Sequence, residues 1–290
     1  SISNYGILKA NKESFGTAMI PSYDFSKAKV IVSVGADFLG TWLSPIEFSK
    51  QFAVNREVTD DKRDMSRLYQ FESNLSLTGA NSDYRSMIKP SQEGLVVAQI
   101  YNILSGNGAK SIDKIAYLEK AAAELKANAG NALVVCGSND KSVQVVVNAI
   151  NNLLGSYGTT ILPSAPVNFR LGNDEEMSAF VADAQAGKVD GVIFFNCNPV
   201  YDHPKGDALA AALKKMTLTV STSSTPDETA SVVSHMAPDH HYLESWSDAE
   251  PKENSFSLTQ PAITPLFKTR QSAESLLVWA GESNTEYFTF

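Results

Sequence analysis

Short apolar runs alternate along the chain with longer stretches in which apolar residues recur every three or four positions. The runs are rich in Val and Ile, as strands buried on both faces of a parallel sheet are, and they cover residues 29–34, 132–136, 191–195 and 218–221. The stretches with helical spacing cover residues 45–54, 91–104, 111–129, 141–154, 174–186 and 205–215. Strands that alternate with helices of this length indicate βαβ units. The pattern therefore predicts an α/β fold with doubly wound, mostly parallel sheets.

Two regions lack a clear period. Residues 55–90 are expected to be rich in loops, and so is the chain after Pro238, where three further prolines precede a short helix near 273–280. Pro45 at a first helical position, after Ser44, predicts the start of the first helix.

Both halves of the chain share one outline. In each half an apolar strand runs into a small polar turn, at 35–37 and at 196–198, and a helix started by a proline, Pro45 or Pro204, follows. A Thr-containing loop that ends in proline then completes each half. Two unrelated βαβ lobes could imitate this outline, because doubly wound folds are common.

The shared outline predicts two doubly wound lobes related by an internal pseudo-repeat. The first is expected to cover residues 1–115 and the second residues 116–290, with a loop-rich C-terminal stretch. Ligands of open α/β sheets bind beyond the carboxyl ends of the strands, and both polar turns lie there. The turns are therefore the first place to look for a binding site.

Composition limits the possible partners. The 290 residues carry a net charge of −8 and show no basic cluster, so we expect no nucleic acid partner. No apolar stretch approaches the roughly 20 residues that a membrane span needs. Cys136 and Cys197 are most simply free thiols, and without a CxxC motif this segment is not expected to hold an iron–sulfur cluster by cysteine ligation. Because the chain opens SISNYG, we expect it to be a piece of a longer polypeptide or a processed product.

Four motifs carry a resemblance to a known family. In chain order they are VIVSVGADFLGTWLSP, TGANSDYRSMIKPSQEG, VDGVIFFNCNPVYDHP and TPDETASVVSHMAPDHHYLESWSDAEP. They follow the order of the molybdopterin oxidoreductases and cover nearly all of the chain, which implies the second and third domains of that fold. Three stretches resemble more narrowly the B subunit of alternative complex III, a bacterial quinol-oxidising membrane complex. They are GADFLGTWLSP, residues 65–81 and APDHHYLESWSDAEP.

The resemblance implies a function through partners. It implies a non-catalytic domain of an iron–sulfur subunit that supports electron transfer from quinol to cytochrome c or to a terminal oxidase. The clusters would lie in a part of the subunit outside this segment, and the partners would be cytochrome c subunits and quinol-binding membrane subunits. The expected location is the periplasmic face of the cytoplasmic membrane, with attachment through those partners.

The polar turns are interpreted as a vestigial cofactor pocket. Its candidate residues are Gly35, Asp37, Asn196, Asn198 and His240. A pyrophosphate needs closely spaced backbone N–H groups with room around them. The first turn instead carries an acid, Asp37, which would repel phosphate, and is followed by the bulky residues Phe38, Leu39 and Trp42. On the family pattern a molybdenum ligand would lie before residue 1, so we expect no catalytic residue, no metal ligand and no cofactor in this segment.

Other chemistries have weaker support. The run Asp239-His240-His241-Tyr242 invites a zinc site, but adjacent histidines on an extended segment point to opposite sides. The chain has no GxSxG, HExxH or P-loop motif. Two alternatives to the non-catalytic domain stay open: a fragment of an active molybdopterin enzyme similar to polysulfide or thiosulfate reductases, and a free-standing nucleotide-binding module.

Aromatic residues in the loops offer a second line of inference. They could bury against neighbouring subunits, since aromatic side chains are enriched in the cores of interfaces, or they could fill the core of the chain itself. The candidates are Phe38, Trp42, Tyr69, Tyr84, Tyr242, Trp246, Phe256 and Phe267.

Overall fold

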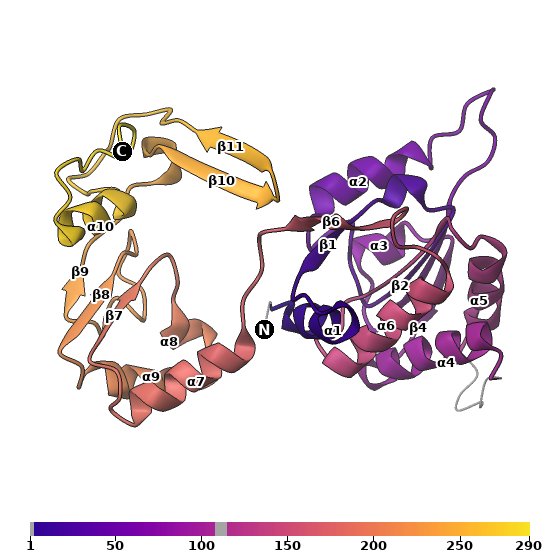
Figure 1. The fold of residues 1–290 in the computed structure, drawn as a ribbon, viewed down its shortest axis with the longest axis horizontal. Coiled ribbons are helices and arrows are strands. Elements are labelled where there is room, and N and C mark those ends of the chain that lie inside the picture. The colour runs from indigo at the N-terminus through magenta and orange to yellow at the C-terminus, as the bar shows by residue number, and fades with distance from the viewer. Residues whose placement is uncertain (1–2, 108–114) are drawn as a thin grey trace. The chain divides into compact units, whose positions relative to one another are not determined.

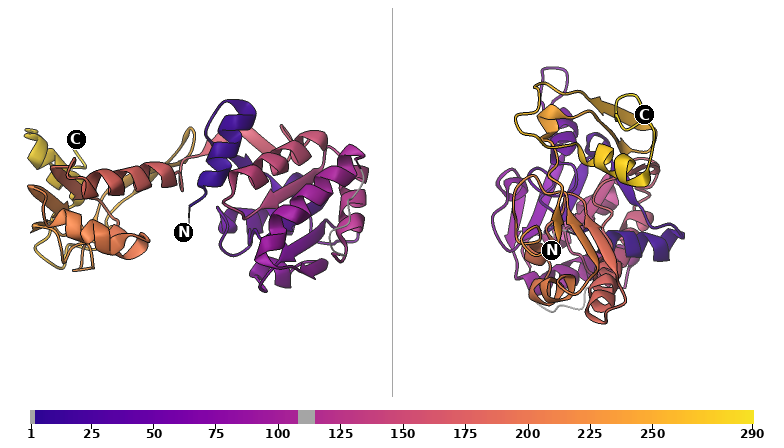
Figure 2. Two further views of the ribbon diagram at one scale, coloured as in Figure 1. Left: turned by 90° about the horizontal axis from the view of Figure 1, so that it is seen from below. Right: turned by 90° about the vertical axis from the view of Figure 1, so that its left-hand side faces the viewer.

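The computed structural model describes residues 3–107 and 115–290, which form two compact units (Figure 1, Figure 2). The N-terminal unit ends at Gly172, and the C-terminal unit covers Asn173–Phe290. This division differs from the expected one between residues 115 and 116. The reason is that strand β5 (Ala132–Cys136) pairs along its whole length with β2 (Val30–Val34) of the first sheet.

A parallel sheet forms the centre of the N-terminal unit. Its four strands are ordered β4-β3-β2-β5, and Val30 of β2 lies opposite Arg67 of β3 and Ala132 of β5. The other two strands of this sheet are β3 (Arg67–Glu72) and β4 (Tyr84–Met87). An antiparallel pair, β1 (Ile20–Tyr23) with β6 (Ile161–Val167), belongs to the same unit.

Helices cover both faces of this sheet. Alternate residues of β2 point to opposite sides: Ile31 belongs to a core that includes residues of α1 and α2, whereas Val32 belongs to a core that includes residues of α4, α5 and α6. The N-terminal helices are α1 (Tyr5–Phe15), α2 (Pro45–Val54), α3 (Leu77–Ala80), α4 (Glu93–Ser105), α5 (Leu118–Ala127) and α6 (Lys141–Leu153), with short 3₁₀ turns η1 (Phe25–Lys27) and η2 (Pro90–Gln92). The predicted doubly wound, parallel α/β class is confirmed.

The C-terminal unit repeats the parallel arrangement on a smaller scale. Strands β7 (Gly191–Phe194), β8 (Leu218–Ser221) and β9 (His235–Met236) form a parallel sheet in that order. Phe194 packs into a core with residues of helices α7 and α9. The remaining elements are α7 (Asp174–Gln185), α8 (Pro199–Asp202), α9 (Gly206–Leu213), η3 (Tyr242–Glu244), the hairpin β10 (Ser247–Lys252) with β11 (Ser255–Thr259), and α10 (Ser272–Ala280).

Several local expectations can be compared with these elements. Pro45 begins α2 as predicted, but Pro204 begins no helix: α8 begins at Pro199 and α9 at Gly206. Strands β3 and β4 lie in the region that was expected to be loops. Of the helix expected at 111–129, α5 is the part observed, and residues 111–114 lie outside the described residues.

The helices are short. The longest in the part of the chain that the structure describes, α4 and α6, have 13 residues each. In residues 3–107 and 115–290 no helix has both the length and the apolar character required to cross a bilayer.

Substituting alanine for Gly206 tests the close approach between α8 and α9. A methyl group there would lie 1.9 Å from the carbonyl oxygen of Val200, and backbone atoms cannot be relieved by a rotamer change. We expect the free energy of unfolding to fall by about 1–3 kcal/mol. Urea denaturation followed by circular dichroism measures it. Gly172→Ala, whose methyl group would meet no atom within 4 Å, is the control and should change little.

Candidate functional site

In the N-terminal sheet, successive strands are added first on one side of β2 and then on its other side. Going outward from β2, strands β3 and β4 follow on one side, and β5 lies on the other side. The carboxyl ends of β2 and β5 therefore form the topological switch point, where open α/β sheets hold their ligands. Gly35 follows β2 and Gly137 follows β5 at this position.

These two turns are packed closely together. Gly35 has a φ of +63°, and its N–H donates to the carbonyl oxygen of Phe71 at 2.8 Å. Gly137 donates to the carbonyl oxygen of Val34 at 2.9 Å, and a Cβ at Gly137 would lie only 2.2 Å from the carbonyl oxygen of Gly35. Two of the backbone donors that line the switch point are thus already used within the sheet.

Asp37 ties the first turn to a buried threonine. Its Oδ1 accepts hydrogen bonds from the backbone N–H of Thr78 at 2.9 Å and from the Thr78 hydroxyl at 2.8 Å. The Thr78 hydroxyl oxygen in turn accepts from the N–H of Leu39 at 3.0 Å, and Thr78 is fully buried. Asp37, which was expected to repel phosphate, thus also has a structural role, because its hydrogen bonds join the turn after β2 to the segment after β3.

The same three bonds form around Asn198 and Thr229 in the C-terminal unit. Asn198 Oδ1 accepts from the N–H of Thr229 at 3.1 Å and from the Thr229 hydroxyl at 2.7 Å, and that hydroxyl oxygen accepts from the N–H of Val200 at 3.1 Å. In both units the N–H that donates to the threonine hydroxyl belongs to the residue two positions after the Asp or Asn. This equivalence gives the internal pseudo-repeat an atomic basis, and we call the three-bond arrangement the threonine link.

The two threonine links differ in where they carry their negative charge. In the C-terminal unit the amide nitrogen of Asn198 donates to the carboxylate of Glu228 at 2.7 Å. In the N-terminal unit the acid is Asp37 itself, and the residue before the threonine is the exposed Leu77. One carboxylate thus accompanies each link: Asp37 in the turn itself in the N-terminal unit, and Glu228 next to the threonine in the C-terminal unit.

A buried carboxylate, that of Glu72, anchors the start of α3, the short helix that contains Thr78. Glu72, at the end of β3, accepts from the Ser76 hydroxyl at 2.6 Å and from Arg85 Nε at 2.6 Å, and the Gln70 side chain donates to it at 3.0 Å. Burial alone would raise the pKa of Glu72, but the hydrogen bonds from Ser76, Arg85 and Gln70 outweigh it and lower the pKa. Sequence reasoning missed this group, although the Ser76 cap at the start of α3 is a local signal that marks the loop.

The bulky residues after the first turn belong to the core. Phe38 is fully buried and stacks on Phe25 with ring centroids 4.3 Å apart, and Trp42 packs near Tyr23 and Phe48. Their expected position, in the space of a phosphate, is therefore corrected: they face the hydrophobic core.

The remaining candidate residues lie in the C-terminal unit. Asn196 adopts a φ of +49°, and its N–H donates to the Thr222 hydroxyl at 3.3 Å. The N–H of His240 donates to Asp239, whose carboxylate also accepts from the N–H of Ser272 at 2.7 Å and so holds the start of α10. Among the described residues, His240 makes no hydrogen bond to Asn196 or Asn198.

The stretch around His240 acts as a loop brace. Glu244 accepts from the N–H of Leu266 at 2.9 Å and from that of His241 at 3.0 Å, and these bonds lower the pKa of Glu244. Throughout the described residues, no three His, Cys, Asp or Glu side chains gather in a way that could hold a metal ion. Cys136 is buried, which raises its pKa to about 12, whereas Cys197 is exposed.

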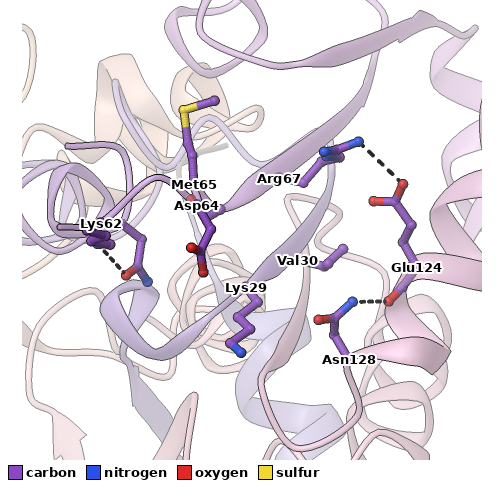
Figure 3. Close-up of a pocket in the computed structure, with 10 residues that line it drawn as sticks. Lys29, Val30, Lys62, Asp64, Met65, Arg67, Glu124 and Asn128 are labelled. Carbon is purple, nitrogen blue, oxygen red and sulfur yellow. Dashed lines mark hydrogen bonds and ion pairs between the residues drawn. The ribbon is translucent and has the colours of Figure 1, made fainter. Parts of the chain in front are cut away.

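A pocket of about 380 Å³ opens at the opposite edge of the N-terminal sheet (Figure 3). It lies at the amino ends of β2 and β3, where Val30 and Arg67 begin these strands. Arg67 lies 3.5 Å from Glu124, and Lys62 lies 3.4 Å from the side-chain oxygen of Asn55. Its charged residues are of both signs: Lys29, Lys62, Asp64, Arg67 and Glu124. Sequence reasoning gave no hint of it.

The fold is of the molybdopterin-oxidoreductase-like α/β class. Over 90% of its length the chain is 25% identical to the menaquinone reductase, molybdopterin-binding-like subunit of Nitratidesulfovibrio vulgaris, and it spans 44% of that protein. Two solved structures are similar in fold. Acetylene hydratase from Pelobacter acetylenicus matches 96% of this chain and 50% of its own with a TM-score of 0.64 and 10% identity. The formyltransferase/hydrolase complex of Methylorubrum extorquens, solved with methylofuran, matches 97% and 83% with a TM-score of 0.59 and 11% identity. No family model matches the chain.

Substitutions of Asp37 test the threonine link. Asp37→Asn keeps the oxygen that accepts from Thr78, as Asn198 does in the other unit, so we expect a change of less than about 1 kcal/mol in the free energy of unfolding. Asp37→Ala leaves the buried Thr78 N–H and hydroxyl without this acceptor and should cost about 1–3 kcal/mol. Urea denaturation of the two variants checks the order, and equal stability of both would contradict the link.

Proposed function

We propose that the chain is a non-catalytic domain of the iron–sulfur subunit of a quinol-oxidising respiratory complex of the alternative complex III type. Its role is structural: it gives the subunit a rigid body for assembly, while electrons pass from quinol to cytochrome c or a terminal oxidase through clusters and haems outside this segment. The protein is located with the rest of the complex at the periplasmic face of the cytoplasmic membrane, and cytochrome c and quinol-binding membrane subunits hold it there.

One observation carries the proposal. At both candidate turns the side chain that could meet a cofactor, Asp37 or Asn198, is already committed to a buried threonine of its own unit. The similarity to a subunit named menaquinone reductase and molybdopterin-binding-like supports the quinone-linked context. We propose that this chain retains the shape of a cofactor domain without the cofactor. The residues of its vestigial pocket are Gly35, Asp37, Asn196, Asn198 and His240.

The exposed apolar side chains of the C-terminal unit support a role in assembly. Phe256 and Leu258 of β11 are 74% and 83% exposed, and they lie on one face of the strand because they are two residues apart. Leu266 and Phe267 are also exposed. Of the aromatic residues proposed from sequence for interfaces, Phe38, Trp42 and Tyr69 fill the core, whereas Tyr242, Phe256 and Phe267 are available to partners.

Metal and pterin analysis of the purified complex tests the non-catalytic assignment. We expect the full-length protein that carries this chain, isolated with its partner subunits, to contain iron but no stoichiometric molybdenum or tungsten. After oxidative release it should show no pterin fluorescence. Stoichiometric molybdenum with pterin would instead establish a fragment of an active molybdopterin enzyme.

A paired substitution in β11 tests the assembly role. Phe256→Ser with Leu258→Ser should reduce the amount of this protein that co-purifies with a tagged quinol-binding subunit by about tenfold, corresponding to about 1.4 kcal/mol. The melting temperature of the isolated protein should change little, because both side chains are exposed. Ile46→Ser, at an 86% exposed position of α2, is the matched control. Unchanged co-purification of the β11 variant would refute the role.

A further inference from the structure

The switch point of the N-terminal sheet contains one charged group that the threonine link does not use. Glu93 is the first residue of α4, and its side chain reaches the turn after β2: a Cβ at Gly35 would lie 2.8 Å from Glu93 Oε1 and 3.1 Å from the carboxyl carbon. The carboxylate therefore lies against the one residue of the turn that has no side chain of its own.

This position is where an anionic ligand of the fold would need backbone donors. A pyrophosphate binds where a glycine lets the backbone approach closely and where a helix begins, because unpaired N–H groups and the helix dipole favour negative charge there. Gly35 is exposed with a φ of +63°, and the carboxylate of Glu93, the first residue of α4, lies against it. A fixed carboxylate at this point takes the place of the anion and repels a second one.

Glu93 is not explained by a structural partner. Its side chain is half-buried, and it makes no hydrogen bond or ion pair within residues 3–107 and 115–290. Burial raises its pKa, and its charge also contributes to the raised pKa of the Cys136 thiol at the end of β5. An acid in the first turn of a helix is favourable to the helix dipole wherever it points, but that effect does not require contact with Gly35.

We propose that Glu93 is the residue that closes the N-terminal unit to phosphate-bearing cofactors, by holding its carboxylate over Gly35 at the topological switch point. The proposal deepens the proposed function and rests on it, since it names the group that keeps this domain free of a dinucleotide. Asp37, which the sequence suggested for this role, is occupied by Thr78, whereas Glu93 faces the glycine directly.

Titration with inorganic pyrophosphate, and with GDP as a second probe, tests the proposal. The full-length protein is used, with binding followed by calorimetry and by phosphorus NMR. We expect the wild-type protein to show no saturable binding up to millimolar concentrations and Glu93→Gln and Glu93→Ala to bind at least about tenfold more tightly. Glu119→Gln removes the same charge from the exposed first turn of α5 and should behave as wild type.

Two outcomes would overturn the role of Glu93: pyrophosphate binding by the wild-type protein as tight as by Glu93→Gln, or variants that bind no better than wild type. These outcomes are separable from failure of the proposed function. A complex that contains molybdenum with pterin would refute the non-catalytic assignment, and with it the claim that this domain excludes a dinucleotide, whatever the titration shows. A metal-free complex whose variant gains nothing would refute the role of Glu93 alone.

A stability measurement provides a readout independent of ligand. Because burial raises the pKa of Glu93 in the folded state, its contribution to stability is present in full below the ordinary glutamate pKa and is lost as the pH rises through the folded value. The melting temperature of Glu93→Gln relative to wild type should therefore increase from acid to neutral pH. A difference that does not change with pH would show that the carboxylate is solvated and away from Gly35.

Discussion

A buried threonine hydroxyl closes the carboxyl edge of the sheet in each unit. Thr78 and Thr229 have no access to solvent, so their N–H and hydroxyl groups must be satisfied by the protein. Asp37 and Asn198 accept hydrogen bonds from these groups. Each hydroxyl oxygen in turn accepts from the backbone N–H of the residue two positions after the Asp or Asn. The conformation of the turn after the first strand of each sheet thus depends on a loop that follows the next strand.

The same bonds limit what these turns can offer to a ligand. A side chain that accepts two hydrogen bonds from a buried residue is held in one orientation, and breaking those bonds to reach a cofactor would leave buried donors unpaired. The repeated use of this arrangement, with a carboxylate at Asp37 in one unit and at Glu228 in the other, shows that geometry is kept while the distribution of charge differs. The turns are therefore well ordered by their own contacts.

Much of the architecture could be predicted from the sequence because strands buried on both faces are unbroken apolar runs. β2, β5, β7 and β8 were found in this way. β3 was missed because Gln70 and Glu72 interrupt its apolar character, and their burial depends on Arg85 and Ser76, which no local pattern connects to them. The repeat was visible as an outline, but the threonine link that explains it joins residues 31 or 41 positions apart.

The positions of the two turns were predictable, but their contacts were not. Sequence position alone located the turns at Gly35 and Asn198, since strands of this kind end in them. Whether Phe38 and Trp42 face the turn or the core depends on how the chain leaves Asp37, and the structure sends them inward. Glu93 could not be assigned to the turn because it lies 58 positions after Gly35 in the chain.

The pairing of β5 with β2 has a consequence for dividing the chain. A truncation near residue 115 would remove β5 and leave the full length of Val-Ile-Val-Ser-Val in β2 as an open sheet edge, with its backbone donors and acceptors unpaired. Edges of that kind recruit other strands and promote self-association. A division after Gly172 keeps this strand pair intact, so the natural fragment for recombinant expression ends there.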